Sequence, residues 1–211
     1  PVLFFLAFDK GEAFGSAAIV GIELGVVSIT AYMLAYGAVS GFAPWPFALA
    51  GGVAAFAGAS LLLRNLNVGL PVAAALAFAS LLLALIVLPR PRGPIVPLAT
   101  PRWDIPARMA ATFTLVAVIM SSADRLGSQL SGIVSTFPVM LTVIGSFTHA
   151  QAGVDAVRRV LRGLSLSLGS FVAFFIAVGL ALPRLGLVGS YAVASLVALA
   201  CSTALIAFAR R

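Results

Sequence analysis

The sequence predicts an all-α integral membrane protein with about eight transmembrane segments. Of its 211 residues, 62% are hydrophobic and only 9% are charged, whereas an average soluble domain has about 25% charged residues. A soluble chain of this length could not remove so much apolar surface from water. The apolar runs are longer than membrane β-strands and lack their two-residue alternation, so helices are the structure that can satisfy the backbone hydrogen bonds in lipid.

The apolar runs, taken in chain order, define the expected segments. One crossing of a bilayer core takes about 20 helical residues, and most of the runs are close to this length. The first run is partial because the chain opens inside it, and we expect further residues upstream. The segments are 1–8, 14–40, 43–63, 68–88, 107–123, 130–148, 160–182 and 185–209.

The longest connection, 89–106, carries six of the twelve prolines. Proline removes a backbone donor and disfavours helix at the residue before it, so this stretch cannot be helical throughout. We interpret it as an interfacial linker with Trp103 at the level of the lipid headgroups. A binding loop is the alternative.

The basic residues lie in short loops and divide unevenly when successive loops alternate between the two sides of the membrane. Nine fall on one side and four on the other, so the positive-inside rule places the larger set and the C-terminus in the cytoplasm. The net charge of +7 is therefore a topology signal, and we expect no nucleic-acid partner. The larger set is Arg90, Arg92, Arg102, Arg108, Arg158, Arg159, Arg162, Arg210 and Arg211, and the smaller is Lys10, Arg64, Arg125 and Arg184.

The chain has a weak internal repeat at an offset of 142 residues. The offset spans five crossings, an odd number, so the two copies would be inverted relative to each other. Inverted repeats are a recurrent plan of secondary transporters, with the substrate site near the membrane midplane. The predicted organisation is a first repeat at 1–66, a connecting helix and linker at 67–106, and a second repeat at 107–211. The matches are Gly11, Gly21, Leu24, Ser28, Ala31, Ala35, Gly37, Ala50, Ser60 and Leu63 with Gly153, Gly163, Leu166, Ser170, Ala173, Ala177, Gly179, Ala192, Ser202 and Leu205, besides the aromatic pair Tyr32 and Phe174.

Short motifs in the second half of the chain carry a family resemblance. They are Leu130-Ser131-Gly132-Ile133, Thr136-Phe137-Pro138, Gly153 with Ala156 and Arg159, and Gly189-Ser190. Residues 105–210 thereby resemble the GlpM-like family of small bacterial inner-membrane proteins with four predicted helices. The first half resembles a degenerate second copy. The resemblance implies a multi-pass protein of the bacterial inner (plasma) membrane, without implying a reaction.

Catalytic patterns are mostly absent from the sequence. It has a single histidine, a single cysteine (Cys201) inside an apolar run, no phosphate-binding loop and no nucleophile-elbow pattern. We therefore assign no catalytic residue, no metal site and no cofactor, and we expect the protein not to be an enzyme.

Glu23 stands inside an apolar helix, where an ionised carboxylate is costly and should face a partner or a wet cavity. Ser16 and Thr30 lie seven residues to either side and so share its helix face. Gly21 and Gly25 form a small-residue pair that permits close helix contact. We interpret Glu23, Ser16 and Thr30 as part of a substrate or ion path. A neutral glutamic acid hydrogen-bonded between packed helices is the alternative.

A second polar region interrupts the apolar pattern at Asp124, Arg125, Gln129 and Ser131, and Pro138 follows it. Because Pro138 has no amide proton to give to the carbonyl four residues earlier, a broken helix lining a protein-enclosed cavity is one interpretation. The other is an extracellular turn followed by a mildly kinked helix.

Three arginines, Arg158, Arg159 and Arg162, cluster in the first turns of the expected helix 160–182. Cations at a helix N-terminus oppose its dipole, so we expect a partner outside the helix, and anionic lipid headgroups are the simplest one. A specific anionic substrate is the sharper alternative. His149 lies nearby at the expected cytoplasmic boundary, either as an interfacial residue or as a proton relay.

Two functions fit these features. The first is a small secondary transporter or permease of unknown substrate, with membrane lipids as its surroundings. The second is a non-catalytic accessory subunit that packs against partner subunits, or against further copies of itself, through its small-residue helix faces. A polar cavity that reaches Glu23 or Gln129 would favour the transporter.

Overall fold

The computed structural model describes residues 12–93, 102–135 and 137–209, and all regular structure within them is helical. The helices are α2 (Glu12–Val39), α3 (Trp45–Leu63), α4 (Leu70–Val87), α5 (Asp104–Ser135) and α6 (Val139–Ala209). Four stretches of the described chain are long and apolar enough to cross a membrane: Ala18–Val39, Trp45–Leu63, Leu70–Val87 and Val139–Leu205. The prediction of an all-α membrane protein is thereby confirmed at this level.

The prediction of eight separate segments is wrong for the described residues. The expected segments 107–123 and 130–148 do not flank a break at Asp124, because α5 continues through this region as far as Ser135. Residues 124–135 contain no proline, so every backbone amide there can join the helix. The chain leaves the helix only ahead of Pro138, whose ring disfavours the helical conformation in the preceding residue.

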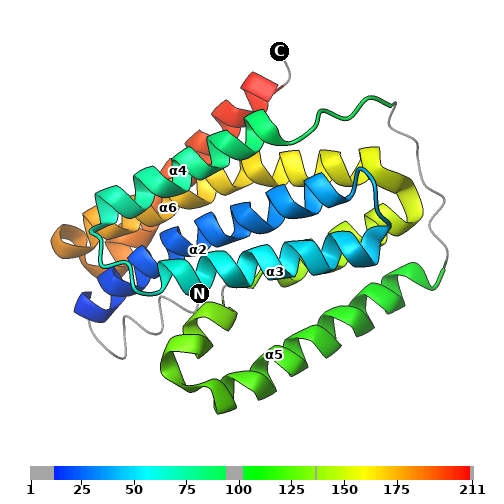
Figure 1. The fold of residues 1–211 in the computed structure, drawn as a ribbon. Coiled ribbons are helices and arrows are strands. Elements are labelled where there is room, and N and C mark those ends of the chain that lie inside the picture. Colours follow the sequence, from blue (N-terminus) through cyan, green and yellow to red (C-terminus); the bar gives the residue numbers. More distant parts are fainter. Residues whose placement is uncertain (1–11, 94–101, 136, 210–211) are drawn as a thin grey trace. The chain divides into compact units, whose positions relative to one another are not determined.

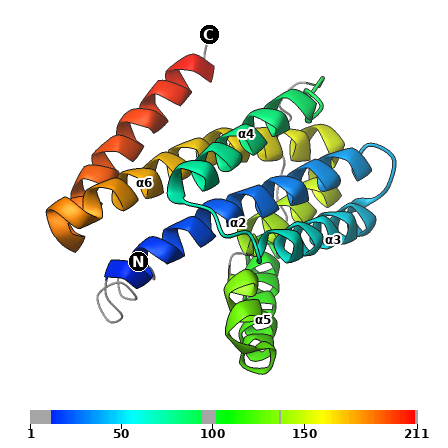
Figure 2. The same ribbon diagram turned by 60° about the vertical axis from the view of Figure 1, so that its left-hand side comes forward.

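The expected segments 160–182 and 185–209 both fall within α6, which runs for 71 residues. This helix is not a straight rod. Its ribbon turns back in its yellow part and again in its orange part (Figures 1 and 2). Gly153 and Gly186 have positive φ angles of 77° and 62°. Glycine adopts that left-handed conformation without the steric cost that other residues incur.

Small residues face inward on the two shorter helices. The buried positions of α3 are Ala48, Gly52, Phe56 and Ser60, one per helical turn, and four of the five buried positions of α4 are alanines. Larger side chains such as Leu62 and Ile86 are exposed. This arrangement is typical of membrane helices, which pack through small residues and present large apolar side chains to lipid.

The chain divides into two compact units, each built from non-adjacent stretches. Unit 1 comprises Pro1–Val27, Leu66–Leu85 and Leu164–Arg211, and unit 2 comprises Ser28–Asn65 and Ile86–Gly163. Each unit therefore draws residues from both of the predicted repeats. The expected first segment, 1–8, lies outside the described residues.

Unit 1 has an apolar core in which Ile19, Val178 and Ala194 are buried and Phe174 and Tyr191 pack against them. Unit 2 has an aromatic core. The rings of Tyr32 and Tyr36 stack with centroids 5.9 Å apart, and the ring of Phe137 meets Tyr32 and Phe56 edge to face.

Candidate functional site

Unit 2 contains a row of buried polar pairs between α2 and the start of α6. The Thr142 hydroxyl donates to the Tyr32 hydroxyl oxygen over 3.3 Å. The Tyr36 hydroxyl lies 3.3 Å from Nδ1 of His149, and their rings meet edge to face. All four side chains are buried. His149 is therefore a packed, hydrogen-bonded residue.

The positions of these pairs follow from helical geometry. Tyr32 and Tyr36 are four residues apart, and Thr142 and His149 are seven apart, so each set lies on one face of its helix. No pattern considered in the sequence predicted a role for the tyrosines or for Thr142. The regular spacing of two tyrosines in an apolar helix was the signal that could have identified them.

Asp104 anchors a polar cluster at the beginning of α5. Its carboxylate accepts hydrogen bonds from Gln151 Nε2 at 2.5 Å and from Arg108 Nε at 2.8 Å. The hydrogen bond from Gln151, followed by that from Arg108, lowers the pKa of Asp104 below its ordinary value although burial acts in the opposite direction. The guanidinium of Arg108 also lies 5.2 Å from the ring centre of Phe147. An acidic residue in the first turn of a helix is favoured by the helix dipole.

The predicted lipid-contact arginines have partners inside unit 2. Arg162 donates to the carbonyl of Leu88 over 2.8 Å, and Arg159 donates to the carbonyl of Gly93. Arg158 lies 3.5 Å from Asp155, with most of its side chain buried. Two of the three guanidinium groups thus hold the backbone that follows α4. Contact of all three with anionic lipid stays a prediction.

The backbone that follows α4 also binds an acidic side chain of α6. The Asp155 carboxylate accepts the amide proton of Gly93 over 3.1 Å, while Arg159, four residues later on α6, binds the carbonyl of that glycine. Both polar groups of the Gly93 backbone are therefore satisfied by one face of one helix turn. We call Asp155, Arg159 and Gly93 the linker clamp.

Glu23 belongs to unit 1. Its side chain is 0% exposed, and neither carboxylate oxygen has a hydrogen-bond partner among the described residues. Thr30, predicted on the same face, is buried in unit 2. The side chain of Ser16 lies outside the described residues.

The second predicted path region is not placed as expected. Asp124, Arg125, Gln129 and Ser131 lie within α5, and their side chains are outside the described residues. Pro138 precedes the first residue of α6, and its carbonyl accepts the amide proton of Thr142 over 2.9 Å. The expected segment 130–148 is therefore interrupted at Pro138, which stands at a helix start, where its missing amide costs nothing. A cavity beside this break stays a prediction.

The described residues provide no obvious metal centre, since no three His, Cys, Asp or Glu side chains among them lie close enough together to hold an ion. No known protein family, curated protein or solved structure matches the chain.

Proposed function

We propose that the protein is a small secondary transporter or permease of the inner (plasma) membrane, with Glu23 as the group that couples transport to a proton or a small cation. The observation that carries the proposal is the full burial of this carboxyl group in an apolar helix, where neither oxygen has a partner among the residues that the structure describes.

The apolar surroundings of Glu23 favour a carboxyl group that is protonated or bound to a cation over an ionised, unpaired carboxylate. An acidic side chain at the centre of a membrane helix costs about 2.5–3.5 kcal/mol on insertion scales, and a buried charge without a partner is worse than a neutralised one. Protonation or binding of a cation removes the charge. A group that must be neutral when enclosed and can ionise when water reaches it has the chemistry that coupled transport requires.

A pair of reciprocal contacts supports an inverted repeat as the frame for such a cycle. In unit 2, a Cβ on Gly37 would lie 2.6 Å from a Leu88 methyl carbon and 3.5 Å from one of Leu161. In unit 1, a Cβ on Gly179 would lie 2.5 Å from a methyl carbon of Leu70 and 3.6 Å from one of Ile19.

The two contacts are related to each other by the repeat offset. Gly179 follows Gly37 by the repeat offset of 142 residues, and Leu161 follows Ile19 by the same offset. Gly37 of the first copy thus contacts Leu161 of the second copy, and Gly179 of the second copy contacts Ile19 of the first. This reciprocity is the pattern that two-fold related copies produce. A leucine completes each contact: Leu70, the first residue of α4, beside Gly179, and Leu88, which directly follows α4, beside Gly37.

The helix directions within unit 2 also agree with inversion. Tyr32 pairs with Thr142 and Tyr36 with His149, so α2 and the start of α6 run the same way. Because α6 turns back in its yellow part (Figure 1), the stretch that follows this turn runs opposite to α2. That stretch is the second copy of α2 under the 142-residue offset.

Transport by purified protein in proteoliposomes tests the proposal. With an imposed proton gradient, we expect at least one solute in a panel of organic anions, organic cations and neutral amphiphiles to evoke a transient current on a solid-supported membrane. Glu23→Gln should abolish proton coupling, because the amide cannot gain or lose a proton. Glu12→Gln makes the same chemical change at the first residue of α2 and serves as the matched control. Wild-type coupling in Glu23→Gln would refute the role of this residue.

An accessory subunit remains the second candidate, and specific contacts favour it. The buried polar side chains of Tyr32, Tyr36, Thr142 and Asp104 are paired within the chain, as expected of a dry scaffold. Gly21 and Gly58 are exposed, with open space where a Cβ would lie, which would let a partner helix approach closely. Co-purification of a stoichiometric membrane partner, lost in a Gly21→Leu, Gly58→Leu double variant, would support this function.

A further inference from the structure

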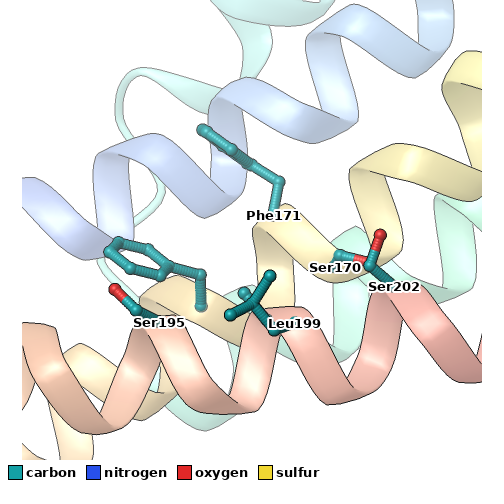
Figure 3. A pocket seen from close by; sticks show the side chains of 7 residues that line it. Ser170, Phe171, Ser195, Leu199 and Ser202 are labelled. Atoms are coloured by element: carbon teal, nitrogen blue, oxygen red, sulfur yellow. The ribbon is translucent and has the colours of Figure 1, made fainter.

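The two units present different surfaces. Unit 1 has an open groove between two stretches of α6, lined by the mainly apolar side chains that Figure 3 shows. The acyl chains of lipid can fill such a groove without a specific polar contact. Unit 2 instead gathers five arginines in two short stretches, 90–92 and 158–162. A ligand bound through its charge is therefore expected at unit 2.

Three segments of unit 2 meet at these arginines. The guanidinium of Arg158 lies against the turn between α2 and α3, where a Cβ on Gly41 would be 3.2 Å from its Nη2 atom. Arg162 binds the carbonyl of Leu88, and the linker clamp joins α6 to Gly93. The turn after α2, the chain that follows α4 and one stretch of α6 are thus adjacent.

This place in unit 2 coincides with the ends of apolar spans. The apolar stretch of α2 ends at Val39, that of α3 begins at Trp45 and that of α4 ends at Val87. Phe42, in the turn, is 81% exposed, and Trp45 is 40% exposed. Exposed tryptophan is typical of the level at which lipid chains give way to headgroups. In a membrane, the arginines would therefore lie at headgroup level.

Arg158 keeps donor capacity for a ligand. Its Nη1 atom lies 3.5 Å from Asp155, farther than the roughly 2.7–2.9 Å of a strong charge-assisted hydrogen bond. Its buried Nε atom has no hydrogen-bond partner among the described residues. A buried donor without a partner carries a desolvation cost, and an anion that draws the guanidinium outward would remove that cost.

The charges around Arg158 are not balanced. The stretches 88–93 and 155–162 together carry five arginines and one aspartate. Arg159 and Arg162 donate to backbone carbonyls, which hold these side chains in place without cancelling their charge. Arg90 and Arg92 are exposed. Clusters of basic residues directly beside membrane helices are typical of sites that bind anionic lipid headgroups.

We propose that Arg158, Arg90 and Arg92 bind the phosphate group of an anionic phospholipid such as phosphatidylglycerol. The planar fork of a guanidinium group matches the oxygens of a phosphate. Arg159 and Arg162 hold the chain that carries Arg90 and Arg92 beside Arg158. The site therefore differs from the one expected from the sequence, in which three arginines of α6 share this role. Lipid binding here does not depend on the transport cycle proposed above.

Fluorescence quenching by brominated lipid tests the site, because Trp45 is four residues from Gly41 and so within about 14 Å of it. The sequence has two tryptophans, and Trp103→Phe leaves Trp45 as the reporter. The full chain with this change is reconstituted into phosphatidylcholine that contains increasing fractions of dibrominated phosphatidylglycerol or dibrominated phosphatidylcholine. We expect phosphatidylglycerol to be preferred beside Trp45 by a factor of about ten, as two or more basic residues near a membrane surface would produce.

Substitutions in the same background identify the arginines that bind the lipid. Arg158→Gln should lower the preference about fivefold, the effect of one basic residue near a membrane surface, and the Arg90→Gln, Arg92→Gln double variant should lower it at least as much. Arg64→Gln makes the same chemical change at an exposed position beyond the other end of α3 and should leave it unchanged. Thermal unfolding of each variant identifies loss of fold. If Arg158→Gln does not fold, the double variant decides, because its two positions are exposed.

Three results would overturn the proposal. The first is equal quenching of Trp45 by the two brominated lipids. The second is a preference that Arg64→Gln lowers as much as the folded variants of the site do, since the net charge of the protein would then be its cause. The third is a preference abolished by millimolar inorganic phosphate but not by chloride of the same ionic strength, since a free phosphate would then be the occupant.

Discussion

Two carboxyl groups of this protein have opposite surroundings. Asp104 accepts hydrogen bonds from Gln151 and Arg108, whereas both oxygens of the buried Glu23 lack partners among the described residues. An unsatisfied buried polar group destabilises a fold, and a satisfied one does not. Asp104 therefore stabilises the fold, whereas Glu23 lowers its stability.

Glu23→Leu should therefore stabilise the protein by about 1–3 kcal/mol, the cost of an unsatisfied buried polar group. Thermal unfolding in detergent measures the change. Asp104→Leu is the matched comparison, and it should destabilise because Arg108 and Gln151 lose their acceptor. A Glu23→Leu variant less stable than wild type would indicate that Glu23 is hydrogen-bonded within the fold.

The lowered pKa of Asp104 predicts how acid affects its cluster. A carboxyl group whose pKa is lower in the folded than in the unfolded state contributes stability above its unfolded pKa and loses that contribution as pH falls through the folded value. The hydrogen bond from Gln151 is the first cause of the lowering. Gln151→Leu should raise the pKa of Asp104, so its loss of charge should begin at higher pH.

Carbon-13 NMR titration of the Asp104 carboxyl group measures this shift directly. Gln129→Leu makes the same chemical change within α5 and is the control. An Asp104 titration curve that is the same in Gln151→Leu and wild type would show that this hydrogen bond does not set the pKa.

Close packing at the level of helices depends on individual glycines. A Cβ on Gly52 of α3 would lie 3.0–3.1 Å from three ring atoms of Tyr32, whereas a Cβ on Gly58 of the same helix meets nothing within 4 Å. The rigid ring of a buried tyrosine cannot move aside as readily as the flexible end of a leucine side chain. The two glycines therefore provide an internal comparison.

Gly52→Ala should destabilise the protein by about 1–3 kcal/mol through overpacking. Gly58→Ala should be neutral or slightly stabilising, since alanine is the better helix former by about 1 kcal/mol. Thermal unfolding of both variants in the same detergent tests the pair. Equal stabilities would contradict the packing of α3 against Tyr32.

The linker clamp ties α6 to the backbone that follows α4. Asp155→Ala removes the acceptor for the Gly93 amide, so hydrogen exchange of residues 88–93 should become faster, by the factor that corresponds to one hydrogen bond of about 1 kcal/mol, roughly fivefold. Hydrogen exchange read by mass spectrometry measures the rates. Arg184→Ala, which lies outside the clamp, should leave them unchanged, and unchanged rates in Asp155→Ala would argue against the clamp.

At the scale of the molecule, the pattern of exposed and buried residues is that of a membrane protein. Alanines and glycines occupy much of the buried surface of α3 and α4, and large apolar residues occupy the exposed surface. Exposed leucines and isoleucines on this scale would cause a soluble protein to aggregate, whereas lipid accepts them.

The basic residues predict an orientation in the membrane, and labelling of cysteine variants tests this prediction. In a Cys201→Ala background, Arg211→Cys should resist a membrane-impermeant maleimide applied to intact cells, and Arg64→Cys should react, because the positive-inside rule places position 211 in the cytoplasm. Permeabilised cells, in which both positions should react, provide the control. The reverse labelling pattern would overturn the proposed orientation.

The sequence by itself determined the helical membrane class, since the length and hydropathy of a run decide whether it suits lipid or water. It did not determine where α5 ends and α6 begins, because the apolar run 130–148 continues across Pro138. It did not determine that α5 continues through Asp124, because polar residues interrupt hydropathy without interrupting backbone hydrogen bonding.

Only the tertiary structure decided which polar groups are partnered. Glu23 and Tyr36 both lie in α2, and Ser170 and Ser195 both lie in α6. Nothing in the adjacent sequence distinguishes Glu23 and Ser170, which lack partners among the described residues, from the other two. His149 meets Tyr36 across 113 positions of sequence. Whether a buried donor finds an acceptor depends on helices brought together from distant parts of the chain, which local composition does not encode.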